Sequence, residues 1–125
     1  MSPAVLSVAF LVVMAAALSC FARAYGVRRT TARHRRFAIA GAAIDVAGTL
    51  VVIVTARGLG WHVPPAFPVV ATVHRACAYA TSAGLVAQVV TGAMRHPLHR
   101  RLGFPFLCAY AVTYALAVWA YAPWW

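Results

Sequence analysis

The chain alternates between long apolar runs and short polar connections. The apolar runs cover residues 4–21, 37–55, 67–94 and 104–121. A helix of about 20 apolar residues crosses a bilayer core about 30 Å thick, so each run is long enough to span a membrane. Short connections make sequential helices neighbours in space. The pattern therefore predicts one domain over residues 1–125, an all-α integral membrane four-helix antiparallel bundle.

Composition agrees with a membrane protein. Hydrophobic residues make up 64% of the 125 residues and charged residues only 10%, and the mean hydropathy is +0.81. A soluble domain normally carries about 25% charged residues. The four apolar runs use nearly the whole chain, which leaves no room for a separate soluble catalytic or binding domain.

The net charge of +10 would suggest nucleic acid in a soluble protein, but the placement of the charges indicates a lipid surface. All eleven basic residues are arginines; nine lie around the first and third connections, and the second connection holds Arg57 alone. Basic loops face the cytoplasm, so we expect both termini on the outer side of a bacterial plasma membrane. Arginines at anionic headgroups need no nucleic acid as a partner. Those expected to contact headgroups are Arg28, Arg29, Arg35, Arg36, Arg100 and Arg101.

The chain offers little to an enzyme. Asp45 is its only acid, and Lys, Glu and Asn are absent. Two-carboxylate chemistry is excluded, and there is neither a Ser/His/Asp order nor a glycine-rich phosphate loop. We expect a protein without catalytic residues.

Polar side chains inside the apolar runs mark the candidate site, since an ionisable residue in a membrane is a functional hypothesis by default. The pair His74-Arg75 lies in the third run, and Asp45 lies in the middle of the second. At about 100° per residue, Asp45 shares one helix face with Gly41, Gly48 and Thr49. The third run carries two adjoining lines of polar side chains along its helix surface, called stripes here. We expect both stripes to face protein. The first stripe contains His74, Thr81 and Gln88, and the second contains Arg75, Tyr79 and Ser82.

Asp45 is the only side chain that could neutralise Arg75 within the bundle. The two segments place Asp45 and His74 about 8 Å apart along the membrane normal, so an arginine or a water could join them. We expect Asp45 to be coupled to His74-Arg75, so that removing either charge destabilises the bundle. In the alternative, Arg75 extends to the headgroups and Asp45 stays protonated beside Gly48 and Thr49. The expected intramembrane network is Asp45, His74, Arg75, Thr49, Thr81 and Gln88.

The five histidines separate by membrane side. His34, His96 and His99 share the cytoplasmic level, and His62 and His74 share the outer side. Imidazole binds transition metals and serves as an axial ligand to haem, so haem b or copper are candidate cofactors. Against this, there is no HxxxH, HExxH or HxH motif, and arginines flank His34 and His99. The candidate ligands are His34, His99, His62 and His74.

Several of these motifs occur together. Arg33-His34-Arg35-Arg36-Phe37 opens the second run, His62 and His74 follow, and His99-Arg100-Arg101 precedes Pro105-Phe106 and Tyr110-x-x-Thr113-Tyr114. Over residues 33–121 the chain resembles a family of small bacterial multi-pass proteins that includes factors associated with the maturation of haem-copper terminal oxidases. The resemblance implies that the protein acts together with a respiratory complex.

We therefore expect a small non-catalytic accessory or assembly subunit of a larger bacterial membrane complex, most plausibly a respiratory one, whose partners are the lipid bilayer and other membrane subunits. One alternative is an electron-transfer subunit in which two histidines hold a haem b. Another is a small proton-coupled transporter that uses Asp45, His74 and Arg75.

Overall fold

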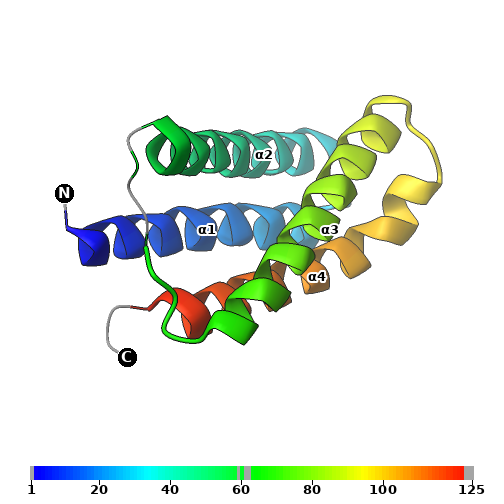
Figure 1. Ribbon diagram of the computed structural model, residues 1–125. Coiled ribbons are helices and arrows are strands. Elements are labelled where there is room, and N and C mark those ends of the chain that lie inside the picture. Colours follow the sequence, from blue (N-terminus) through cyan, green and yellow to red (C-terminus); the bar gives the residue numbers. More distant parts are fainter. Residues whose placement is uncertain (1, 59, 61–62, 123–125) are drawn as a thin grey trace.

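The computed structural model describes residues 2–58, 60 and 63–122, and it is an all-α bundle (Figure 1). All four helices are long and apolar enough to cross a membrane. The predicted class, a multi-pass helical membrane protein, is confirmed. The helices are α1 (Pro3–Gly26), α2 (Thr31–Ile53), α3 (Pro68–Ala93) and α4 (Leu98–Tyr121), and a π-helical turn, η1 (Val54–Gly58), follows α2.

The helices extend beyond the apolar runs at the arginine-rich end. α2 begins at Thr31 and α4 at Leu98, well before the apolar runs that start at residues 37 and 104. Backbone hydrogen bonding continues where a helix leaves the hydrocarbon, whereas hydropathy detects only its apolar part. Pro105 lies inside α4. Its ring frees the carbonyl of Arg101 four residues earlier, at the polar end of the helix, where water or headgroups can bond it.

The helices pack in the order α2, α1, α4, α3. α1 packs against both α2 and α4, and α3 packs against α4 (Figure 1). Among the described residues, no comparable packing joins α2 to α3. The prediction that sequential helices are neighbours therefore holds for the α1/α2 and α3/α4 hairpins and is wrong for α2 and α3. The connection before α3 is fastened instead to α4, by the N–H of Ala66 donating to the carbonyl of Ala120 at 2.9 Å.

Phe21 of α1 lies where three helices meet. Its ring meets the rings of Phe106 and Tyr110 edge-on, with centroids 5.1 and 5.2 Å apart. On α2, Gly41 faces the same ring, and a Cβ there would lie 2.7 Å from Phe21. Lipid tails are as apolar as these side chains, so helices associate through close van der Waals packing, which small residues permit. Gly41 thus allows α2 to approach α1 closely.

We predict that Gly41→Ala destabilises the bundle. The added methyl would meet the Phe21 ring at 2.7 Å and Cys20 Cβ at 3.2 Å, and overpacking of this kind costs about 1–3 kcal/mol. Gly26→Ala is the matched control, because nothing lies within 4 Å of a Cβ built at Gly26. Unfolding by a denaturing detergent in mixed micelles would compare them. Equal stability of the two variants would contradict this packing.

Candidate functional site

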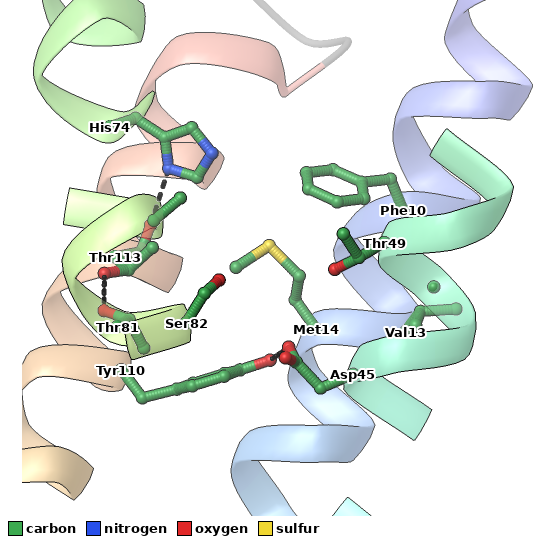
Figure 2. A pocket seen from close by; sticks show the side chains of 12 residues that line it. Phe10, Val13, Met14, Asp45, Thr49, His74, Thr81, Ser82, Tyr110 and Thr113 are labelled. Atoms are coloured by element: carbon green, nitrogen blue, oxygen red, sulfur yellow. Dashed lines mark hydrogen bonds between the residues drawn. The ribbon is translucent and has the colours of Figure 1, made fainter. Parts of the chain in front are cut away.

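A cavity of about 70 Å³, lined by both apolar and polar side chains, lies among the four helices (Figure 2). One water molecule needs about 10–15 Å³ of cavity volume, so the cavity has room for a few waters or one small solute. α1 supplies the apolar wall with Phe10, Val13 and Met14. The polar lining comes from the other three helices and consists of Asp45, Thr49, His74, Thr81, Ser82, Tyr110 and Thr113.

Asp45 is held by Tyr110. The Tyr110 hydroxyl donates to Oδ1 of Asp45 at 2.5 Å, across the floor of the cavity as seen in Figure 2. Each residue lies near the middle of its helix, and α2 and α4 run in the same direction (Figure 1), so the two groups share one depth. Tyr110 is buried and Asp45 is half-buried. The hydrogen bond therefore joins the two hairpins at the centre of the molecule.

In the described part of the chain, Asp45 does not pair with Arg75. The expected coupling between these two residues is therefore not present. Arg75 is exposed and donates from its guanidinium to Oγ1 of Thr72, one turn earlier on α3, at 3.3 Å. The reason is helical phase: Arg75 follows the buried His74 by one residue, which turns it about 100° away. Tyr79, on the same stripe as Arg75, is also exposed. The arrangement matches the alternative in which Arg75 leaves the cavity.

His74 is buried and belongs to a hydrogen-bonded chain between α3 and α4. Its Nδ1 lies 3.0 Å from the carbonyl oxygen of Thr113, and because a carbonyl only accepts, Nδ1 carries the hydrogen. The other ring nitrogen points towards the side of the cavity where Phe10 lies (Figure 2). Thr113 donates from Oγ1 to the carbonyl of Ala109 at 2.8 Å, so Thr81 Oγ1, 2.9 Å away, donates to Thr113. His74 and Thr81 are thus joined through Thr113.

The remaining members of the expected network lie apart from one another. Thr49 lines the cavity but is exposed at its edge. Gln88 is buried further along α3 towards the arginine-rich end, and within the described residues its Nε2 has no hydrogen-bond partner. Its backbone carbonyl accepts from Nδ1 of His99 at 3.1 Å. The six predicted residues therefore do not form one network.

The cavity opens sideways between α2 and α3. Thr49 on α2 and Ser82 on α3 both line it, and both are exposed. No close packing joins those two helices within the described chain. Polar side chains at this depth normally face protein or a water-filled cavity. This lateral opening is thus the feature of the site that a function has to explain.

Of the four candidate haem or metal ligands, two come together. His34 and His99 face each other with 3.4 Å between their Nε2 atoms. This separation is too small for the plane of a haem, whose iron would need one nitrogen on each face. His74 lies alone near the other end of the bundle, and His62 lies outside the described residues. Within the described residues, no group of three or more His, Cys, Asp or Glu side chains is placed to hold a metal ion.

The arginines expected at headgroups are all exposed. Arg28 folds back over the ring of Tyr25 at 4.3 Å and donates to the Tyr25 carbonyl at 3.1 Å. The whole set lies at the end of the bundle where α1 joins α2 and α3 joins α4. Exposure at that end is compatible with headgroup contact, which stays a prediction.

Sequence reasoning missed Tyr110 and Thr113 as the partners of the site. The depth of each residue in the membrane could have indicated the pairing. Asp45 and Tyr110 lie at similar heights on two spans that run in the same direction. Thr113 and Tyr110 also lie one turn apart on one face of α4. Matching depths across parallel spans would have placed Tyr110 opposite the only acid.

We predict that Asp45 is energetically coupled to Tyr110 and not to Arg75. Tyr110→Phe removes the donor to a half-buried carboxyl and should cost about 1–3 kcal/mol, and Asp45→Leu added to it should recover part of that loss. Two double-mutant cycles by detergent unfolding, one with Tyr110 and one with Arg75→Gln, would test this. Tyr114→Phe serves as the control. Additivity in the Tyr110 cycle, or a large coupling in the Arg75 cycle, would refute the assignment.

Comparison of the chain with family models, with curated proteins and with solved structures finds no match in any of the three. The resemblance to oxidase maturation factors therefore rests on the sequence motifs of residues 33–121.

Proposed function

We propose that this protein is a small accessory or assembly subunit of a larger membrane complex. The observation that carries the proposal is the cavity with polar side chains in its lining, which opens sideways between α2 and α3. A self-contained bundle would enclose such a cavity on all sides. This one leaves it uncovered near the middle of the spanning segments.

The cost of that opening favours a partner. An aspartate at the centre of a membrane helix costs about 2.5–3.5 kcal/mol on insertion scales. Asp45 is only half-buried, and it lines the cavity together with the exposed Thr49 and Ser82. A helix of a partner protein in the gap would remove these groups from lipid and could hydrogen-bond to them. The cavity edge is thus proposed as the contact with the partner.

The surface of α2 offers the matching apolar contact. Within the described residues, α1 is the one other helix of the bundle against which α2 packs closely. Four of its large apolar side chains are exposed, with exposed fractions of 50% or more: Ile39, Val46, Leu50 and Val51. Because apolar side chains also suit lipid, the proposal depends on the polar edge. The sequence resemblance proposes a bacterial respiratory complex, related to haem-copper oxidases, as the partner.

We predict that a photo-crosslinking amino acid at position 49 captures one defined larger membrane protein in native membranes. The same amino acid at Val12, an exposed position on α1 that does not line the cavity, should not capture it. Mass spectrometry of the products would name the partner. A product of two copies of this 13.4 kDa chain, or equal products from both positions, would contradict the accessory function.

A second candidate is a small proton-coupled transporter, favoured by the size and lining of the cavity. Asp45 could bind and release a proton while Tyr110 holds its orientation, and the inward nitrogen of His74 could hydrogen-bond a solute. Room for a few waters restricts the solute to that size. Arg75, exposed outside the cavity, has no part in this candidate.

For the transporter candidate we predict proton flux into liposomes that contain the purified protein, driven by a potassium diffusion potential and followed with a pH-sensitive dye. Asp45→Asn should abolish the flux, because the only side-chain carboxyl of the sequence is lost. Thr72→Val, an exposed position on α3, should leave it unchanged. Wild-type flux no greater than that of empty liposomes would eliminate proton transport through this cavity in the absence of a solute.

A further inference from the structure

A pair of histidines joins the two hairpins at the arginine-rich end. His34, in the first turns of α2, meets His99, in the first turn of α4. Their Nε2 atoms are 3.4 Å apart, while the ring centroids are 5.6 Å apart. The two nitrogens therefore lie between the rings and face each other.

The hydrogen bond of the other ring nitrogen, Nδ1, fixes which nitrogen of each histidine carries the hydrogen. Nδ1 of His34 is 2.9 Å from the carbonyl oxygen of Ala24, and Nδ1 of His99 is 3.1 Å from the carbonyl oxygen of Gln88. Carbonyl oxygens only accept, so both Nδ1 atoms carry hydrogen. In neutral rings, both Nε2 atoms then present lone pairs to each other. Such a contact is repulsive unless a cation lies between them.

The separation suits a metal ion better than a shared proton. Nitrogen ligands about 2.0–2.1 Å from a tetrahedral Zn²⁺ are about 3.3–3.4 Å from each other, and the observed separation is 3.4 Å. Hydrogen bonds from N–H to oxygen usually span about 2.7–3.2 Å, and those to a nitrogen acceptor are slightly longer. The pair lies at the long end for a hydrogen bond and within the range for two ligands of one metal ion.

The surroundings also match those of metal-binding histidines. Such histidines almost always donate their second N–H to a carboxylate, a backbone carbonyl or water, which fixes the ring, and both of these do so. Gly92 makes space for one ring, because a Cβ there would lie 3.0 Å from Cε1 of His99. Both rings are half-buried, so water can reach the remaining coordination positions.

We propose that His34 and His99 form a two-histidine site for a first-row transition-metal ion of the Zn²⁺ class, with water as the other ligands. The neighbouring arginines, Arg33, Arg35 and Arg100, are exposed, so solvent screens their repulsion and they reduce the affinity without closing the site. Cu²⁺ should bind more tightly than Zn²⁺, following the usual order for nitrogen sites. A bound ion would fasten the α1/α2 hairpin to the α3/α4 hairpin.

The test is Zn²⁺ binding to the purified full-length protein in detergent, by equilibrium dialysis with metal analysis, together with thermal unfolding. We expect one Zn²⁺ per chain and a higher melting temperature that a chelator reverses. His34→Asn and His99→Asn each keep a donor near the place of Nδ1 but lack Nε2. Each should weaken binding by at least about tenfold, since a change beyond the ligands already costs that much. His96→Asn is the control, because His96 is exposed and its Nδ1 accepts from the N–H of Leu98, two residues later in the chain.

A measurement on the wild type makes the test independent of variant folding. The electron paramagnetic resonance spectrum of bound Cu²⁺ should show coupling to two imidazole nitrogens. Coupling to fewer than two, or Zn²⁺ binding that follows His96 instead, would overturn the proposal. So would a wild type that binds no Zn²⁺.

Discussion

Tyr110 is the central attachment between the two hairpins of this molecule. Its ring packs edge-on against Phe21 of α1, and its hydroxyl donates to Asp45 of α2. One side chain of α4 thus contacts both helices of the first hairpin. In lipid, where apolar burial does not drive helices together, such directed contacts and close packing determine which helices associate.

Two further polar contacts join the hairpins, one near each end of the bundle. At the arginine-rich end, His34 meets His99; at the other end, the Ser7 hydroxyl donates to the carbonyl of Tyr121. All three contacts link the first hairpin to α4. α3 is attached to α4 through His74 and Thr81, and it has no comparable attachment to α2 among the described residues. The order of the helices and the gap between α2 and α3 both follow from this distribution.

Much of the fold could be predicted from the sequence, because bilayer thickness limits what an apolar run can be. Hydropathy and helical phase predict the four spans. They also predict the face of α2 that packs closely through Gly41 and Gly48, and the buried stripe of α3. In the structure, a Cβ at Gly41 would meet Phe21 and one at Gly48 would meet Val13. The buried residues of α3 include His74, Thr81 and Gln88. These features depend on one helix at a time.

The partner of Asp45 could not be predicted in the same way, because it depends on which helix lies opposite. Periodicity gives the direction and depth of a side chain but not its neighbour. Short connections made α3 the natural neighbour of α2, and Arg75 then became the obvious partner. In the structure α4 supplies the partner, and a neutral hydroxyl replaces the guanidinium.

The cavity and the histidine pair lie at two levels of the same junction. Asp45–Tyr110 and His34–His99 both bridge α2 and α4, and these two helices are held together by side chains rather than by close backbone packing. A change in the separation of the hairpins would therefore alter both contacts. If a partner helix between α2 and α3 favours one separation and a metal ion favours the same one, each strengthens the binding of the other by an equal factor. The junction of α2 and α4 is thus where events at the cavity and at the arginine-rich surface would be coupled.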